Sequence, residues 1–321
     1  MARFLITGIA GFIGSTLAHR LVEEGHEVSG IDNLSTGNLE NLEDIRSSIR
    51  FEQTDLRDAG ALRSACKGIE FILHQGALAS VPRSVKDPVG SHESNINGTL
   101  NLLLAARDAG VKRIVYAASS SAYGDQPTQP KHEEMCPRPL SPYAVQKLTC
   151  EYYIQSFSKS YGLEGVCLRY FNIFGPRQAA DSPYSGVIAQ FIYKMMDGVT
   201  PTIYGDGLTS RDFTFVDNAV NANLLACKAP SEVANGRVFN VGTGKSRTLN
   251  EVYQGIASAL GFKEQPLYGP ERVGDVKHSL ASIERARKEL GYEPKADFHQ
   301  GLEKTVAWYL SERRKHQPVS A

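Results

Sequence analysis

The sequence has few of the features that mark secreted, membrane or metal-binding proteins. Its 321 residues include only five cysteines. The odd number argues against a disulfide framework, and no two cysteines stand at the spacing of metal ligands, so we expect a reduced, cytoplasmic setting and no metal. No apolar run approaches the roughly 18 residues of a membrane-spanning helix. A basic segment followed by a long apolar segment is also lacking at the N-terminus, so we expect neither a signal peptide nor a membrane partner.

An excess of charge of one sign is absent too. Lys plus Arg and Asp plus Glu number 35 each, which argues against nucleic acid as a partner. Repeats and low-complexity segments are lacking as well. The fractions of hydrophobic residues (41%) and charged residues (22%) are ordinary for a globular protein. A chain of this length can bury a large core without covalent links.

Short apolar runs alternate with helical patterns over the first part of the chain. The expected strands lie at residues 4–6, 27–31, 51, 71–73, 114–116 and 166–168. The expected helices of this part lie at residues 12–24, 95–109 and 143–161. This alternation predicts an α/β fold in which a doubly wound parallel sheet is covered by helices on both faces.

The pattern changes after about residue 176, where proline and glycine become frequent. Two further helical patterns cover residues 249–260 and 282–290. We expect residues 1–176 to form the first domain, with residues 216–242 returning to it. Residues 177–215 and 243–315 would then form a smaller α/β domain over the carboxyl edge of the sheet. Residues 316–321 are expected to be a flexible tail.

A glycine-rich turn joins the first expected strand to the first expected helix. In Gly8-x-x-Gly11-x-x-Gly14, the first glycine permits the tight turn and the second lets the backbone approach a pyrophosphate. The third lets the helix pack closely on the strand. Asp32 ends the next strand, where a carboxylate binds a ribose hydroxyl and repels a 2′-phosphate, which favours NAD over NADP. The alternatives are a purely structural turn and, for Asp32, a capping role.

A tyrosine and a lysine stand one helical turn apart at Tyr143 and Lys147. A free phenol with a pKa near 10 is a poor base at neutral pH, but a nearby ammonium group and a positive nicotinamide ring would lower that pKa. Ser119, Ser120 and Ser121 follow the fifth strand, at the sheet edge where ligands bind in such folds. A surface helix pair and a plain serine loop remain the alternative interpretations.

Several further motifs accompany these residues, and together they resemble one enzyme family. The motifs are residues 7–14, 32–34, 97–99, 119–124, 143–147, 169–172, 175–177, 210–213 and 272–275. They resemble the extended short-chain dehydrogenase/reductases, and more narrowly the UDP-sugar 4-epimerases that act on UDP-glucose or UDP-N-acetylglucosamine. The resemblance implies a Rossmann-type sheet, a tightly bound NAD that is regenerated in each turnover, a UDP-hexose substrate and a homodimer.

The resemblance also implies residue roles. Ser119, Tyr143 and Lys147 would be catalytic. The residues assigned to the cofactor are Gly8, Gly11, Phe12, Ile13, Gly14, Asp32, Asn33, Asp55, Leu56, Gln75, Ala77, Asn97, Lys147 and Tyr170. Those assigned to the substrate are Ser80, Ser120, Ser121, Tyr143, Asn172, Val187, Tyr204, Arg211, Arg272, Asp275 and Ser279.

One of these positions bears on which sugar is bound. In the resembled family, the residue four after the aspartate of Arg-x-Gly-Asp sets the size of the sugar pocket, and here that residue is Ser279. A small residue there admits a 2-acetamido group. The resemblance therefore favours UDP-N-acetylglucosamine and UDP-N-acetylgalactosamine, with UDP-glucose and UDP-galactose as a second pair. A loop shift that makes the size of Ser279 irrelevant is the alternative.

Three features qualify the resemblance. Gly76 stands where the family often has alanine, which removes one methyl group near the cofactor. The serines at 119–121 replace the Thr-Asp-Glu of the dehydratases, so water elimination lacks its acid and base. His74 is interpreted as structural.

Two rival functions remain: a UDP-glucuronate epimerase or decarboxylase, for which Arg83 is a candidate cation, and a non-catalytic NAD-binding module. The dimer seam is expected along residues 95–109 and 143–161, with Cys150 and Tyr153 as candidates.

Overall fold

The computed structural model describes residues 1–179, 186–271 and 276–316. Its strands are β1 (Arg3–Thr7), β2 (Glu27–Asp32), β3 (Ile49–Gln53), β4 (Phe71–His74), β5 (Arg113–Ser119), β6 (Glu164–Tyr170), β7 (Ile173–Phe174), β8 (Thr202–Tyr204), β9 (Ser210–Arg211), β10 (Thr214–Phe215), β11 (Arg237–Val241), β12 (Arg247–Thr248), β13 (Leu267–Gly269) and β14 (His278–Ser279). Its α-helices are α1 (Phe12–Glu23), α2 (Ala59–Ala65), α3 (Val81–Lys86), α4 (Pro88–His92), α5 (Gly98–Asp108), α6 (Pro142–Tyr161), α7 (Val187–Met196), α8 (Val216–Lys228), α9 (Ser231–Ala234), α10 (Leu249–Leu260), α11 (Glu284–Leu290) and α12 (Phe298–His316). Three further helical segments are of other helix types: η1 (Leu39–Ser48), η2 (Glu93–Asn97) and η3 (Ser120–Tyr123).

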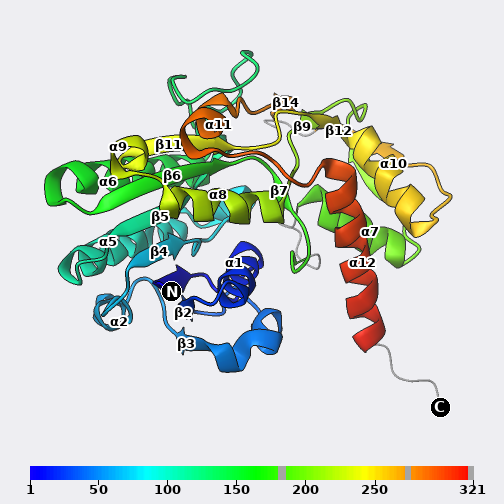
Figure 1. Ribbon diagram of the computed structural model, residues 1–321. Helices are drawn as coiled ribbons and strands as arrows, with labels where there is room; N and C mark the ends of the chain where they lie inside the picture. The colour runs from blue at the N-terminus through cyan, green and yellow to red at the C-terminus, as the bar shows by residue number, and fades with distance from the viewer. Residues whose placement is uncertain (180–185, 272–275, 317–321) are drawn as a thin grey trace.

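A seven-stranded sheet in the order β11-β6-β5-β4-β1-β2-β3 forms the larger half of the molecule (Figure 1). All its neighbouring strands are parallel. The chain direction across the sheet reverses between β1 and β4, which creates a crevice at the carboxyl ends of the strands. The predicted doubly wound Rossmann-type sheet is therefore confirmed.

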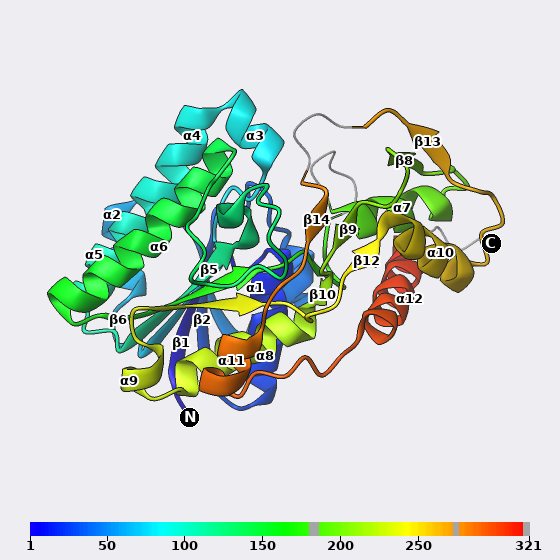
Figure 2. The same cartoon turned by 90° about the horizontal axis from the view of Figure 1, so that it is seen from above.

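Helices cover both faces of this sheet (Figure 2). One face packs on α2, α5 and α6, and the other packs on α1, α8 and α11, each around its own cluster of buried hydrophobic side chains. The predicted long helix at 143–161 is α6. It starts at Ser141, whose hydroxyl accepts from the Ala144 N–H, and ends at Gly162 with φ +71°.

The smaller half has a separate core. Helices α7, α10 and α12 enclose buried aromatic residues that include Phe191, Tyr253 and Phe298. Three small sheets, β10-β7, β12-β9-β14 and β13-β8, flank these helices (Figure 2). The helix predicted at 249–260 is α10, which begins with a reciprocal capping box between Thr248 and Glu251. Among the described residues, no helix is long and apolar enough to cross a bilayer.

Candidate active site

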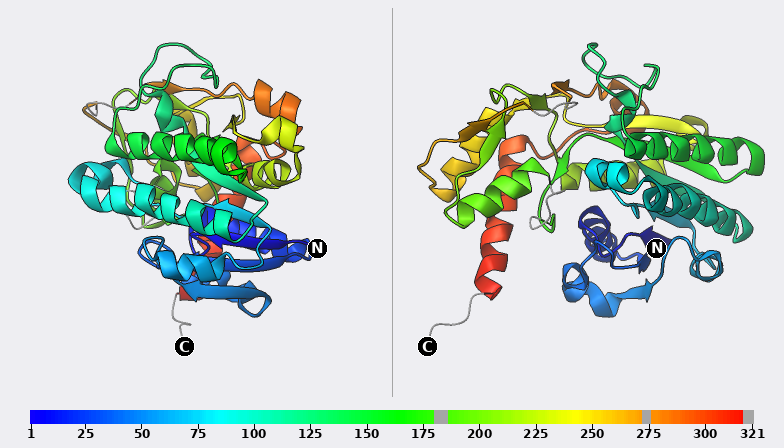
Figure 3. Two further views of the ribbon diagram at one scale, coloured as in Figure 1. Left: turned by 90° about the vertical axis from the view of Figure 1, so that its left-hand side faces the viewer. Right: turned by 180° about the vertical axis from the view of Figure 1, so that it is seen from behind.

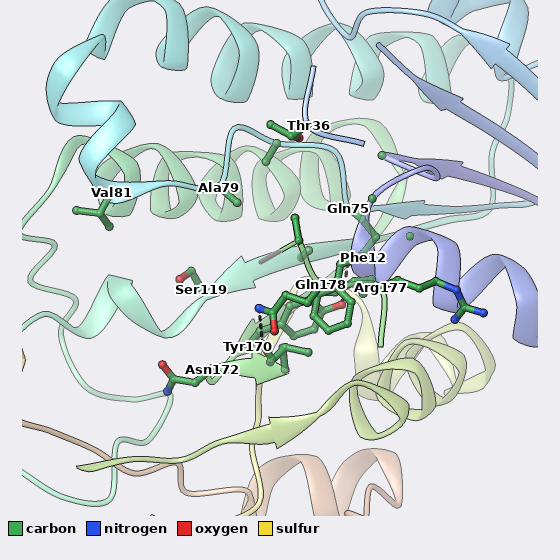
Figure 4. Close-up of a pocket in the computed structure, with 18 of the residues that line it drawn as sticks. Phe12, Thr36, Gln75, Ala79, Val81, Ser119, Tyr170, Asn172, Arg177 and Gln178 are labelled. Atoms are coloured by element: carbon green, nitrogen blue, oxygen red, sulfur yellow. Dashed lines mark hydrogen bonds between the residues drawn. The ribbon is translucent and has the colours of Figure 1, made fainter. Parts of the chain in front are cut away.

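A cleft of about 1860 Å³ lies at the carboxyl ends of the sheet strands and extends to α7, α12 and β14. Its lining includes the glycine turn, the serines after β5, the start of α6 and residues of the smaller half (Figure 4). The site is therefore built by segments that are far apart in the sequence. Such a crevice is where open α/β sheets bind their ligands.

The glycine turn lies at the floor of the cleft and is packed against backbone. Gly8 has φ +68°, and a Cβ there would approach the Gly76 Cα to 2.8 Å. A Cβ at Gly14 would lie 2.0 Å from the Gly8 carbonyl oxygen. Gly11 is the N-cap of α1, which has no side-chain cap and no acidic residue in its first turn. The free N–H groups of α1 therefore face the cleft and suit a phosphate anion.

Asp32 and its neighbours line a smaller hollow of about 90 Å³ beside the turn, together with Asn33, Asp55 and Leu56. The Asp32 carboxylate accepts from the Ala10 N–H (3.0 Å) and the Leu34 N–H (2.8 Å). Burial raises the pKa of Asp32, and these two hydrogen bonds oppose the rise. A held carboxylate next to the turn matches what a dinucleotide ribose requires, so these residues fit NAD.

A buried polar triangle closes the cleft behind the turn. The Tyr170 hydroxyl donates to Gln75 Oε1 (3.2 Å) and accepts from Asn223 Nδ2 (2.7 Å), while Gln75 Nε2 donates to Asn223 Oδ1 (3.2 Å). Gln75, Ala77 and Tyr170 all line the cleft. Asn223 was not among the predicted site residues, although it is hydrogen-bonded to Gln75 and Tyr170, which were assigned to the cofactor. Burial raises the pKa of Tyr170 to about 12, so its phenol stays protonated.

Ser119, Tyr143 and Lys147 meet in the same cleft. Ser119 ends β5, and its hydroxyl oxygen accepts from the Ser121 hydroxyl (2.8 Å). Lys147 is buried, and its Nζ donates to the Ala117 carbonyl oxygen (2.7 Å) and lies 4.9 Å from the centre of the Tyr116 ring. The helix places both α6 side chains on its cleft-facing side, as the spacing predicted.

The electrostatics of these groups differ in part from the sequence argument. Burial raises the pKa of Tyr143, and the hydrogen bond with Ser119 is the effect that opposes this rise. Burial also lowers the pKa of Lys147 to about 8. The expectation that Lys147 lowers the tyrosine pKa is not met by the protein groups alone, because desolvation outweighs them.

The start of α6 makes hydrogen bonds with residues that the sequence motifs did not assign to the site. The Tyr143 N–H donates to Ser84 Oγ (3.0 Å). Gln146, buried one helical turn on from Tyr143, donates to Ser91 Oγ (2.9 Å) and accepts from Asn95 Nδ2 (2.8 Å). Asn95 also bonds both backbone groups of Leu78 next to the cleft. Of these residues, only Asn95 could have been identified from the sequence, because it lies within the expected helix 95–109 and shares its helical spacing of polar residues.

The predicted substrate residues on the far wall lie around β9 and β14. Asn172 adopts φ +37° and its Nδ2 donates to the Asp212 carbonyl oxygen (3.2 Å). Arg211 pairs with Ser279 in the parallel bridge between β9 and β14, and its guanidinium donates to the carbonyl oxygens of Ser210 and Lys277. Asn172, Arg211 and Ser279 line the cleft, as do Ser120 and Ser121.

Other predicted residues are not brought to the cleft. Asn97 is exposed, whereas Asn95 two residues earlier is buried. Ser80 uses its hydroxyl as the N-cap of α3, where it accepts from the Arg83 N–H (3.2 Å). Tyr204 is 41% exposed at the end of β8, and neither it nor Val187 lines the cleft. Arg272 and Asp275 lie outside the described residues.

The structure also bears on the sequence interpretations of His74 and Cys150. His74 is buried between the hydroxyls of Thr7 (2.7 Å) and Thr99 (2.9 Å), and burial lowers its pKa to about 3. It is thus a structural residue, as predicted, and no cluster of metal ligands occurs among the described residues. The expectation that Cys150 lies at an outer seam is wrong, because its thiol is buried and donates to the Asn95 carbonyl oxygen (3.4 Å).

Known proteins are similar along almost the whole chain. A UDP-glucose 4-epimerase of Mycolicibacterium smegmatis is 40% identical over 312 residues, covering 96% of this chain and 98% of that protein. A UDP-glucuronate 4-epimerase of Thermodesulfobacterium geofontis is 34% identical over 319 residues, covering 96% of each. The solved structure of a UDP-N-acetylglucosamine 4-epimerase from Methanobrevibacter ruminantium, in complex with UDP-N-acetylmuramic acid, has a TM-score of 0.92 and 40% identity. It covers 97% of this chain and 99% of that one.

The family comparison agrees with the cleft. The NAD dependent epimerase/dehydratase family matches residues 4–242, a span that includes the glycine turn, Ser119, Tyr143 and Lys147. NAD is therefore the cofactor, as Asp32 and the turn predicted. The chain belongs to the NAD dependent epimerase/dehydratase family, as an enzyme of the extended short-chain dehydrogenase/reductase type.

Proposed function

We propose that the protein interconverts UDP-N-acetylglucosamine and UDP-N-acetylgalactosamine by epimerisation at C4, with UDP-glucose and UDP-galactose as a second pair. The observation that carries this proposal is a single cleft that joins the glycine turn, Ser119, Tyr143, Lys147 and Ser279. Similarity to the UDP-glucose and UDP-N-acetylglucosamine 4-epimerases over nearly the full chain supports the reaction. A non-catalytic NAD-binding module would not need the three catalytic side chains together.

In the proposed mechanism, Tyr143 removes the proton from the 4-hydroxyl of the sugar. Ser119 holds that oxygen by a hydrogen bond and also opposes the raised pKa of the phenol. NAD held by the glycine turn, Asp32 and Lys147 would supply the hydride acceptor and donor for C4, and its positive ring would favour the phenolate. With the sugar turned about its link to UDP to present its other face, Tyr143 would return the proton to O4, and the cofactor would be regenerated.

Binding energy in this mechanism comes from the UDP, which does not depend on the sugar face that is presented. Arg211 and Asn172 on the far wall are the proposed contacts, together with Arg272, because a guanidinium fork suits diphosphate oxygens. The proposed role of Asp275 in the same subsite rests on the family resemblance. Roles for Tyr204 and Val187, which do not line the cleft, rest on the resemblance alone. Lys147, buried against Ala117, would hold the nicotinamide ribose.

Ser279 supports the choice of sugar. It lies in β14 on the cleft wall, and its side chain is small, which leaves space for a 2-acetamido group. Arg83, the candidate cation for a C6 carboxylate, does not line the cleft, although other cationic side chains such as Lys131 and Arg177 do. The uronic acid sugars are therefore tested as substrates beside the neutral hexoses.

Product analysis tests the proposal. The protein is incubated with each of the four hexose nucleotides and with UDP-glucuronate, and products are identified chromatographically. We expect C4 epimers of the acetamido pair, and a loss of about 100-fold or more in kcat for Tyr143→Phe, the range of a lost general base. Full activity of Tyr143→Phe would remove this residue from the mechanism.

Ser279→Tyr should reduce turnover of the acetamido pair selectively. An equal loss for both pairs would contradict the proposal that the size of residue 279 selects the sugar.

We also propose a homodimer through α5 and α6, which lie side by side on the outside of the sheet (Figure 3). Leu104, Val145 and Tyr152 expose 36%, 48% and 55% of their surface on these helices. Val145 and Tyr152 are seven residues apart and share one helix face. Such apolar side chains suit a symmetric interface.

A further inference from the structure

A buried hydrogen-bonded chain connects the turn after Ser119 to the segment that carries Ser279. It starts at Tyr123, the last residue of η3, whose side chain is 1% exposed. The Tyr123 hydroxyl donates to Asn240 Oδ1 in β11 (2.7 Å). Burial raises the pKa of the Tyr123 phenol to about 12, so this group remains a donor near neutral pH.

Both polar atoms of the Asn240 side chain have hydrogen-bond partners. Its Oδ1 accepts from Tyr123, and its Nδ2 donates to the carbonyl oxygens of Lys131 (2.9 Å) and Ser282 (3.1 Å). Because the amide faces two acceptors on one side and a hydroxyl donor on the other, only one orientation satisfies every partner. The side chain is completely buried, so an unmet partner would be costly.

The two carbonyl groups that Asn240 holds belong to segments that pair with each other. Lys131 and Ala281 form a parallel bridge, in which the Lys131 N–H donates to Leu280 O (2.7 Å) and the Ser282 N–H donates to Lys131 O (2.8 Å). Gln129, two residues before Lys131, donates to His278 O (2.7 Å) and accepts from the Leu280 N–H (3.1 Å). Both backbone neighbours of Ser279 are therefore tied to this loop.

The other edge of the Ser279 segment is held by β9, where the Asp212 N–H donates to Ser279 O (2.7 Å). In Figure 2, β14 lies between the sheet and the helices of the smaller half. Its position relative to Ser119 thus depends on β9 on one side and on the Gln129–Lys131 loop on the other, where the Lys131 carbonyl oxygen accepts from Asn240. The centre of the Tyr123 ring lies 4.7 Å from Cζ of Arg169, whose guanidinium forms a bidentate ion pair with Glu151 of α6.

We propose that Tyr123, Asn240 and Gln129 are positioning residues that fix the Ser279 segment at a set distance from the reacting sugar and thereby determine discrimination for the 2-acetamido group. None of the three needs to touch the reacting atoms. Loosening the connection lets the cleft wall at Ser279 move, so contacts to the acetamido group are lost while Ser119, Tyr143 and Lys147 remain held by β5 and α6. This inference rests on the proposed function.

The test compares UDP-N-acetylglucosamine with UDP-glucose in steady-state assays of the NAD-loaded protein. Tyr123→Phe removes one buried hydrogen bond, which corresponds to about a fivefold change. We expect KM for the acetamido sugar to rise by about this factor, while KM for UDP-glucose and both kcat values stay within about twofold. Gln129→Ala, at an exposed residue whose side chain bonds the backbone on both sides of Ser279, should act in the same direction. In a Tyr123→Phe background, the Ser279→Tyr penalty on the acetamido sugar should shrink.

Tyr253→Phe is the matched control. Tyr253 is also buried, and its hydroxyl donates to a backbone carbonyl oxygen, that of Glu264 (2.9 Å), where Tyr123 donates to the side-chain amide oxygen of Asn240. It should leave the ratio of the two sugars unchanged. If Tyr123→Phe and Gln129→Ala leave the ratio unchanged or weaken both sugars equally, the positioning role is overturned while the epimerase stands. A wild-type protein that converts neither sugar overturns the proposed function and this inference together.

Discussion

Gly11 offers a way to separate cofactor binding from folding. Its backbone has φ −78° and ψ 174°, which any residue adopts, and a Cβ there meets only the Gly8 carbonyl oxygen, at 3.2 Å. An alanine at this position requires the Gly8 carbonyl oxygen to shift by a few tenths of an ångström. The added methyl group would occupy the space in front of α1 where the pyrophosphate of NAD is expected. We therefore expect Gly11→Ala to fold and to lose NAD.

The size of the effect follows from the contacts that the methyl group displaces. Hydrogen bonds to a charged group contribute about 1.5–3 kcal/mol each. Two such bonds from the uncapped N–H groups of α1 amount to about 3–6 kcal/mol, or at least about 100-fold in Kd for NAD. The free energy of unfolding without nucleotide should change by less than about 1 kcal/mol, because the backbone conformation suits alanine.

The assay measures NAD affinity by titration calorimetry and the unfolding free energy by urea titration, both on protein stripped of nucleotide. Gly14→Ala is the control, because its Cβ would lie 2.0 Å from the Gly8 carbonyl oxygen and must disturb the turn itself. We expect that variant to lose several kcal/mol of stability. Wild-type NAD affinity in Gly11→Ala would refute the placement of the pyrophosphate. Unfolding of Gly11→Ala as easily as Gly14→Ala would refute the claim that the chain has room.

Two further predictions concern buried charges. Glu151→Gln breaks the buried pair with Arg169 and should cost about 3 kcal/mol of unfolding free energy. Glu289→Gln, in a partly exposed pair with Arg237, should cost less than about 1 kcal/mol; equal losses in urea titrations would contradict this account. Burial lowers the folded pKa of Lys147 to about 8, so above pH 8 the unfolded chain binds the extra proton and stability rises with pH. Relative to Lys147→Met, the nucleotide-free wild type should gain about 2 kcal/mol between about pH 7.5 and 9.5, and a constant difference would show that Lys147 does not titrate there.

Much of the fold could be predicted from local patterns. The strands of a sheet that is covered on both faces are short apolar runs, so residues 71–73 and 114–116 were readily identified in β4 and β5. Helix α8 was harder to identify, because the buried polar side chains of Asn218 and Asn223 interrupt its apolar spacing. Asn218 bonds backbone groups of Lys295 and Ala296, and such partners lie far along the chain.

The limits were similar at the site. A motif gives the residue types but not the helix face, and Asn95 and Asn97 point about 200° apart on a helix. The structure buries the first and exposes the second. Likewise, assigning Ser80 to the substrate overlooked Pro82, which lies in the first turn of α3 and favours a helix start capped by the Ser80 hydroxyl. The network around Asn240 was beyond sequence reasoning, because its partners Tyr123, Lys131 and Ser282 meet only in the folded chain.

The place of β11 at the edge of the sheet has a consequence for the order in which the chain folds during synthesis. β11 pairs with β6, yet 66 residues separate the end of β6 at Tyr170 from the start of β11 at Arg237. Until residue 241 has left the ribosome, the backbone of β6 presents an unpaired strand edge, which invites association with other nascent chains. We expect this interval to be the most aggregation-prone stage of biogenesis, and chaperone binding to arrested nascent chains to fall once β11 has emerged.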